Sequence, residues 1–123
     1  ESGGGAFGQA TAAPDVPVYK TSYQTPVSPT WNEPLDKEGR PSSHREYTLQ
    51  WEIATGKNPS SETGWKTFQD YYFNCIQDCD NYMLKVLDYL KENDLLKNTI
   101  IVSTSYHGEM LGSHGMKGKN GNI

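Results

Sequence analysis

The chain has 123 residues, of which 34% are hydrophobic, and a mean hydropathy of -0.76. This length fits one ordinary domain, but the apolar material is modest, so we expect a small, local core. The formal net charge of -4 supplies no basic surface for nucleic acid or anionic lipid, which argues against both kinds of partner. No apolar run approaches the roughly 20 residues that a membrane-spanning helix needs, so we expect no membrane segment.

Residues 1–59 are rich in glycine, proline, serine and threonine, and they contain all seven prolines of the chain. Proline fixes φ and removes a backbone donor, so this composition predicts an irregular region with sparse regular structure. The exception is a short helix predicted over residues 46–53. The chain starts with neither an initiator methionine nor the basic and apolar stretches of a secretory leader. We therefore expect an internal segment of a longer protein.

A long amphipathic helix is predicted from about Gly64 to Asn93. Apolar and aromatic residues recur there at spacings of three and four, which places them on one helical face. Serine and threonine hydroxyls just before it can cap its first turn. Cys75 and Cys79 lie one helical turn apart and match no zinc or disulfide framework. We expect both to be core thiols.

The segment TIIVSTS, residues 99–105, is rich in β-branched side chains and has consecutive apolar residues at 100–102. Such a run, without alternation, predicts a strand that is buried on both faces. A long helix, a short loop and a buried strand make half of a parallel α/β unit. We therefore expect an α/β fold, although the chain supplies no convincing neighbour for this strand.

Glycine and polar residues replace the apolar run after residue 105, in the stretch YHGEMLGSHGMKGK. Ligands of open α/β sheets bind beyond the carboxyl ends of the strands, so a functional loop is expected here. His107, Glu109 and His114 could bind zinc, but their spacing is not that of an HExxH helix. Residues 112–119 lack the GK[ST] ending of a phosphate-binding loop. We expect neither of these sites.

The order of these features resembles the sulfatases, a branch of the alkaline phosphatase superfamily. A helix ending in VLDYL is followed by LLKNT, by IIV and by TSYHGEMLGSHGMKGK, and the resemblance covers roughly residues 66–123. It implies a partial alkaline-phosphatase-like fold, in which residues 60–123 form a helix–strand–loop segment of the catalytic domain. Residues 1–59 would then be a variable excursion, and the remainder of the domain would complete the sheet. By analogy with the family, the compartment would be periplasmic, secreted or lysosomal.

The resemblance also implies a reaction and a set of site residues. Sulfatases hydrolyse sulfate esters with Ca²⁺ or another divalent cation and a formylglycine nucleophile, and His107 matches one of the metal ligands. The residue before it is normally Asp, whereas Tyr106 stands here; a neutral phenol is a weaker calcium ligand than a carboxylate. Lys119 matches the catalytic lysine that contacts the sulfate group, and His114 matches a substrate-side histidine. Lys117 is expected to be a solvated loop lysine.

Other parts of the sulfatase pattern are missing. No C-x-P-S-R-type motif, whose cysteine or serine becomes formylglycine, occurs in the chain. We therefore expect the nucleophile to lie upstream and this chain alone to be inactive. Two alternatives remain open: a phosphoryl-transfer relative, such as a phosphodiesterase or phosphoethanolamine transferase, and a non-catalytic relative in which Tyr106 marks a lost metal site. An upstream threonine or unmodified serine would favour the phosphoryl reaction.

Overall fold

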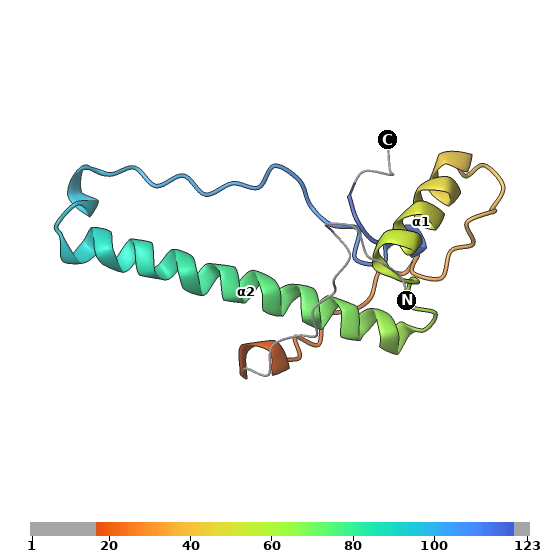
Figure 1. Ribbon diagram of the computed structural model, residues 1–123, viewed down its shortest axis with the longest axis horizontal. Helices are drawn as coiled ribbons and strands as arrows, with labels where there is room; N and C mark the ends of the chain where they lie inside the picture. Colours follow the sequence, from red (N-terminus) through yellow and green to blue (C-terminus); the bar gives the residue numbers. More distant parts are fainter. Residues whose placement is uncertain (1–16, 120–123) are drawn as a thin grey trace.

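The computed structural model describes residues 17–119, and its longest element is the helix α2 (Glu62–Glu92). A second helix, α1 (Ser42–Thr55), and the carboxyl-terminal loop (residues 108–119) lie at the amino-terminal end of α2 (Figure 1). The other end of α2 lies away from both of them (Figure 1). Short 3-10 turns make up the remaining elements: η1 (Pro17–Lys20), η2 (Leu96–Asn98) and η3 (Ser113–Gly115). Residues 1–16, on which the expectation of an internal segment rests, and residues 120–123, the last of the sulfatase-like stretch, lie outside the described residues.

The long helix predicted from about Gly64 to Asn93 is confirmed as α2. Its first turn is capped by the Ser61 side chain, whose Oγ accepts a hydrogen bond from the Gly64 amide at 3.1 Å. Glu62 in the first turn and Lys91 in the last turn complement the helix dipole. Local signals therefore suffice to define both ends of this helix.

The segment before α1 runs across the first half of α2. Tyr23 donates its backbone N–H to the Asp70 carboxylate at 2.9 Å, and the Asn74 amide donates to the Thr21 carbonyl at 2.8 Å. Asn74 is only 1% exposed, and backbone from a distant part of the chain accepts a hydrogen bond from its buried side-chain nitrogen. Tyr19 reaches Asp78 one turn further along, at 3.1 Å. Beyond that turn, large apolar side chains of α2 such as Tyr82, Val86 and Tyr89 are exposed.

The predicted buried strand is wrong. Residues 99–105 have no regular structure, and Ile100 and Val102 are 91% and 80% exposed. Residues 17–119 contain helices but no strand, so the predicted α/β class with its partial alkaline-phosphatase-like sheet is contradicted for this part of the chain. The physical reason is that a strand is stabilised by ladder hydrogen bonds and packing from neighbours, and local β-propensity alone provides neither.

Helix α1 contains the short helix predicted over 46–53 and extends it to Ser42–Thr55. It starts directly after Pro41 and ends at Gly56, whose φ of 87° is a conformation that favours glycine. Tyr47 and Trp51, one turn apart, stack with their ring centroids 5.8 Å apart. The helix is only weakly amphipathic, and these aromatic side chains are among the groups that attach it to the rest of the molecule. The division of the chain at residue 59 stays a prediction.

The core is small and local, as the composition predicts. Among the described residues, only two hydrophobic side chains are fully buried, Trp65 of α2 and Met116 of the carboxyl-terminal loop. The expected core thiols are corrected in part: Cys75 is half-buried, but Cys79 is exposed. No helix within residues 17–119 combines the length and apolar character that crossing a bilayer requires.

Candidate functional site

The sulfatase-like loop, residues 108–119, closes on itself. The Met110 amide donates to the Gly118 carbonyl and the Gly112 amide to the Met116 carbonyl, both at 2.9 Å. The Glu109 carboxylate accepts a hydrogen bond from the Gly118 amide, which ties the two arms of the loop together. Gly118 has a φ of 89°, a left-handed conformation that glycine adopts without the cost paid by other residues.

The loop rests on the core through Trp65. Met116 and Trp65 are both 0% exposed, and the Gln69 amide donates to the Leu111 carbonyl at 3.2 Å. At Gly112, which has a φ of 94°, a Cβ atom would lie 3.1 Å from the Trp65 ring. A glycine there lets the loop backbone lie directly on the indole. The first turns of α2 thus form the floor of the loop.

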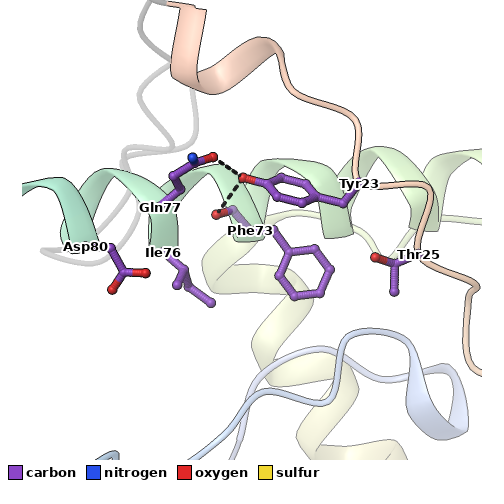
Figure 2. Close-up of a pocket in the computed structure, with 6 residues that line it drawn as sticks. All are labelled: Tyr23, Thr25, Phe73, Ile76, Gln77 and Asp80. Atoms are coloured by element: carbon purple, nitrogen blue, oxygen red, sulfur yellow. Dashed lines mark hydrogen bonds between the residues drawn. The ribbon is translucent and has the colours of Figure 1, made fainter. Parts of the chain in front are cut away.

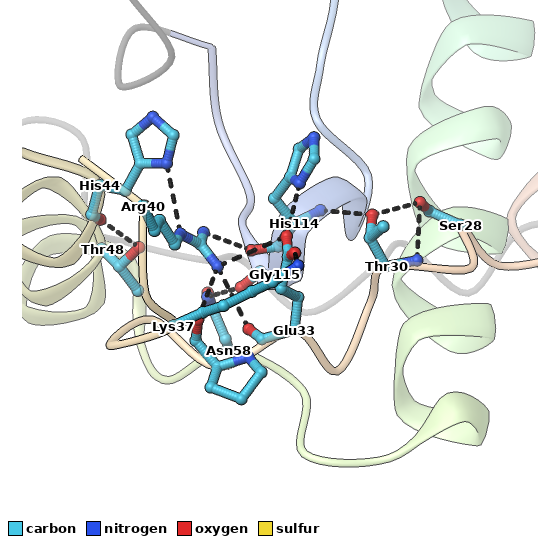
Figure 3. Close-up of polar contacts among 11 residues, drawn as sticks. Ser28, Thr30, Glu33, Lys37, Arg40, His44, Thr48, Asn58, His114 and Gly115 are labelled. Atoms are coloured by element: carbon cyan, nitrogen blue, oxygen red, sulfur yellow. Dashed lines mark hydrogen bonds and ion pairs between the residues drawn. The ribbon is translucent and has the colours of Figure 1, made fainter.

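The tip of the loop is held by residues from the proline-rich region (Figure 3). The Arg40 guanidinium donates to the His114 carbonyl at 2.5 Å, and the His114 amide donates to Thr30 Oγ1 at 2.9 Å. Asn58 donates to the neighbouring Gly115 carbonyl at 2.9 Å. His114 Nδ1 also lies 2.6 Å from the Glu33 carboxylate. His114 is therefore engaged through its backbone and its ring in holding the loop.

Glu33 is the electrostatic centre of this group of contacts. Its Oε1 lies 2.5 Å from Lys37 Nζ, and its Oε2 faces His114. Hydrogen bonds from Lys37 first, and from His114 second, lower the pKa of Glu33 to about 2. The carboxylate is consequently ionised at neutral pH and available to both partners.

Lys117 is not the solvated lysine that the sequence predicts. Its side chain is only 7% exposed, and its ammonium donates to the Gly56 carbonyl at 2.5 Å, at the end of α1. Burial lowers the pKa of Lys117, an effect opposed by the nearby carboxylates of Glu52 and Glu109. Its ammonium thus binds the carboxyl-terminal end of a helix, where a cation complements the dipole.

Lys119, by contrast, has an exposed side chain and a bound backbone. It borders a small cavity of about 200 Å³ that is lined by Gly108, Glu109, Met110, Gly118 and Lys119. Its amide donates to the Tyr47 hydroxyl of α1 at 3.0 Å. The ammonium is thus free to point toward a ligand while the backbone is held.

His107 directly precedes Gly108, which borders the cavity beside Lys119, but His107 is not among the residues that line this cavity. His107 Nδ1 lies 3.1 Å from the Gly108 carbonyl, and its Nε2 is buried with no hydrogen-bond partner. His114 lies on a different cavity, of about 220 Å³, with Glu33 and Arg40. Lys119 and His114 therefore line two different cavities, and His107 lines neither of them.

Tyr106, the residue before His107, is exposed. Its side chain is 93% exposed, and its ring meets only the edge of the His107 ring, with centroids 4.0 Å apart. Calcium takes about six to eight oxygen ligands, and residues 17–119 bring together no group of three acidic, histidine or cysteine side chains that could hold an ion. Tyr106 and His107 do not fit a complete calcium site by themselves.

Another cavity, of about 350 Å³, is lined by residues outside the sulfatase-like loop (Figure 2). It is formed where Tyr23 crosses α2 beside Phe73 and Ile76. The Tyr23 hydroxyl donates to the Gln77 side chain at 2.5 Å and contacts the Phe73 carbonyl at 3.5 Å. These contacts attach the amino-terminal segment to the helix, and none of the predicted site residues lines this cavity.

Comparison with known families decides the ancestry of the chain. A family model described as Sulfatase matches residues 12–122, almost the whole sequence. The chain belongs to the sulfatase family. The resemblance of the sulfatase-like loop to this family is thereby confirmed. The matched region begins well before residue 66 and includes α1.

Two sulfatase relatives align with most of the chain. A protein of Formosa agariphila named Sulfatase is 31% identical over 104 residues, which is 85% of this chain and 18% of that protein. Arylsulfatase K of Canis lupus familiaris is 30% identical over 97 residues, or 79% of this chain and 17% of that protein. The chain therefore spans less than a fifth of the length of these relatives. No solved structure matches it.

A third relative shares a shorter stretch. The low-salt glycan biosynthesis sulfotransferase Agl7 of Haloferax volcanii is 42% identical over 53 residues, or 43% of this chain and 13% of that protein. Its name describes sulfuryl transfer. Proteins with differently named reactions thus share part of this sulfatase sequence.

Sequence reasoning missed the residues that support the loop. Arg40, Tyr47 and Asn58 each contact it from positions at least 57 residues away. No local pattern marks them, because a hydrogen bond between such distant residues leaves no spacing to detect. The one available signal is that the charged residues Glu33, Lys37 and Arg40 interrupt an otherwise proline-rich stretch.

Proposed function

We propose that this chain is part of a sulfatase that hydrolyses sulfate esters, and that Lys119 contacts the sulfate group. The observation that carries the proposal is the arrangement of Lys119, whose backbone is bound to α1 while its side chain is exposed at a cavity. Membership of the sulfatase family supports the reaction class. An ammonium at this place offsets the negative charge that develops during sulfuryl transfer.

The closed loop supports catalysis by positioning. Its backbone hydrogen bonds and its seat on Trp65 fix the loop before substrate binds, so little reorganisation is required when charge develops. His107 is proposed to be a metal ligand in the complete protein, supported by its Nε2, which has no hydrogen-bond partner among the described residues. We assign His114 to holding the loop, because its ring binds Glu33 on another cavity.

The remaining catalytic groups are proposed to come from outside this chain. A divalent cation would neutralise charge on the sulfate oxygens, and a formylglycine would supply the nucleophile. Ligands in addition to His107 are required for that cation, since Tyr106 is exposed to solvent. An exported or lysosomal compartment is part of the same proposal.

Exposed apolar side chains support a larger body around this segment. Val86 and Tyr89 on α2, and Ile100 and Val102 after it, are each more than half exposed. Several large apolar side chains exposed within one segment are typical of a surface that another polypeptide covers. We propose that the rest of the sulfatase polypeptide covers it.

The test is sulfate ester hydrolysis by the complete natural protein and by this chain alone, with an aryl sulfate and a sulfated sugar as substrates. We expect turnover by the complete protein and none by the 123-residue chain. Lys119→Ala should lower kcat by about 100-fold or more, whereas Lys66→Ala, at an exposed lysine of α2, is the control. Full activity of the Lys119 variant would contradict the assignment.

A second candidate reaction is transfer of the sulfuryl group to an acceptor other than water. The similarity to the Haloferax volcanii sulfotransferase favours it. Product analysis in the presence of a sugar acceptor separates the two reactions, since hydrolysis releases free sulfate and transfer yields a new ester. An aryl phosphate diester assayed in parallel addresses the phosphoryl-transfer alternative.

A further inference from the structure

The backbone of Lys119 is joined to helix α1 by a single well-formed contact. Its amide donates to Tyr47 Oη at 3.0 Å, across 72 residues of sequence. The Tyr47 ring is itself held, because it stacks on Trp51 with an interplanar angle of 15°. The acceptor that meets the Lys119 amide is thus fixed by packing as well as by its own helix.

The residue before Lys119 explains how α1 approaches the loop so closely. A Cβ atom at Gly118 would lie 2.1 Å from Tyr47 Oη and 3.1 Å from the Trp51 ring, so no side chain fits there. The amide of Gly118 binds the Glu109 carboxylate, and its carbonyl accepts from the Met110 amide at 2.9 Å. The Gly118–Lys119 backbone is therefore held by the loop on one side and by α1 on the other.

We propose that Tyr47, supported by Trp51, is the positioning residue of Lys119. A lysine ammonium sits at the end of a flexible four-carbon stem, so the direction of its Cα–Cβ bond decides which volume it can reach. The hydrogen bond from the Lys119 amide to Tyr47 sets that direction. This inference rests on the proposed function only for the step in which the ammonium acts on substrate.

The effect of the Tyr47 hydroxyl can be measured separately from that of its ring. Tyr47→Phe keeps the stack on Trp51 and removes only the acceptor of the Lys119 amide. Tyr23→Phe is the matched control, because it also removes a bonded hydroxyl, but one that contacts Gln77 on α2. A role of Tyr47 in general stability would make the two variants behave alike.

Amide hydrogen exchange on the 123-residue chain tests the contact without any reference to activity. We expect the Lys119 amide to be protected, and Tyr47→Phe to speed its exchange by about tenfold, as the loss of one hydrogen bond implies. The Gly112 amide, bonded to Met116, should be unchanged and serves as the internal reference. An unprotected Lys119 amide in the unaltered chain, or no change in the variant, would overturn the inference.

Kinetics of the complete protein tests the consequence for Lys119. Tyr47→Phe should lower kcat by about three- to tenfold with KM unchanged. Added to Lys119→Ala, the same substitution should have no further effect, because the group that it positions is gone. An equal loss in both backgrounds would show a merely structural role and overturn the proposal. Absence of sulfate hydrolysis by the unaltered protein would refute the proposed function and leave the exchange result to decide on the contact.

Discussion

The two ends of α2 differ in almost every physical respect. At the amino-terminal end, Trp65 is completely buried under the sulfatase-like loop, which α1 and the proline-rich segment hold by hydrogen bonds. At the other end, Tyr82 and Tyr89 are more than half exposed, and residues 99–105 have no regular structure. One helix thus carries a packed site at one end and an uncovered apolar surface at the other.

The proline-rich region before α2 contributes to the packed end of this helix. Residues between 28 and 58 contribute every contact that holds the tip of the loop, through Thr30, Glu33, Arg40 and Asn58. The other groups that hold the loop are Trp65 and Gln69 of α2, helix α1 and the loop's own hydrogen bonds. The region before α2 is therefore part of the site's support, and substitutions there should act on the loop.

The strongest test of the difference is the floor of the loop. Trp65→Ala removes the largest buried side chain, and loss of such a side chain typically costs about 3–5 kcal/mol of unfolding free energy. Tyr82→Ala, at a side chain that is 62% exposed, should change it by less than about 0.5 kcal/mol. Urea unfolding followed by circular dichroism measures both. Similar losses in the two variants would contradict the comparison.

The close approach of α1 is tested at Gly118. Gly118→Ala adds a Cβ against Tyr47 and keeps a φ of 89°; the left-handed strain costs about 1–2 kcal/mol and the overpacking at least about 1 kcal/mol more. Gly39→Ala is the matched control, since its φ is 79° but nothing lies within 4 Å of the new atom. The difference between the two losses of unfolding free energy measures the steric contact of the new Cβ atom with Tyr47. Equal losses would show that α1 does not lie in close contact with Gly118.

The support of the loop tip depends on Arg40, whose side chain is 5% exposed. Arg40→Ala removes the donors to the His114, Glu33 and Pro34 carbonyls, so we expect a loss of about 2 kcal/mol in unfolding free energy. Arg45→Ala, at an exposed arginine of α1, is the control. Faster amide exchange at Ser113–Gly115 should accompany the loss in the Arg40 variant. Unchanged exchange at these residues would show that Arg40 does not hold the loop.

The dependence of the unfolding free energy on pH in the acid range tests the role of Glu33. Its pKa is lowered from 4.5 to about 2 by Lys37 first and His114 second. Because the folded state binds this proton less readily than the unfolded chain, the contribution of Glu33 is complete above about pH 4.5 and is lost as the pH falls toward 2. Glu33→Gln should make the unfolding free energy less dependent on pH over that interval, and Glu38→Gln is the control. Identical acid titrations of the two variants would argue against the contact.

The smallest effect is expected at the uncovered end. Ile100→Asn in the 123-residue chain should leave unfolding free energy within about 0.5 kcal/mol, because the side chain is 91% exposed. In the complete natural protein the same substitution should cost about 1–3 kcal/mol if another surface covers the residue, since an amide would be buried. Equal, small effects in both proteins would argue against that covering surface.

The sequence by itself determined the long helix, the family and the loop that carries Lys119. Helix periodicity and the Ser61 cap are local, so α2 could be predicted nearly to the residue. The glycine-rich loop was likewise recognisable, because its residues follow one another directly in the chain. Features encoded by neighbours in sequence were the predictable ones.

Only the tertiary structure decided which predicted features are buried and which distant residues hold the site. Residues 99–105 have the composition of a strand, but a strand requires a partner that local sequence cannot provide. Lys117 and Lys119 are two lysines in one loop, yet the first is buried against α1 and the second is exposed at a cavity. Their difference comes from Gly56 and Tyr47, which lie far away in sequence and close in space.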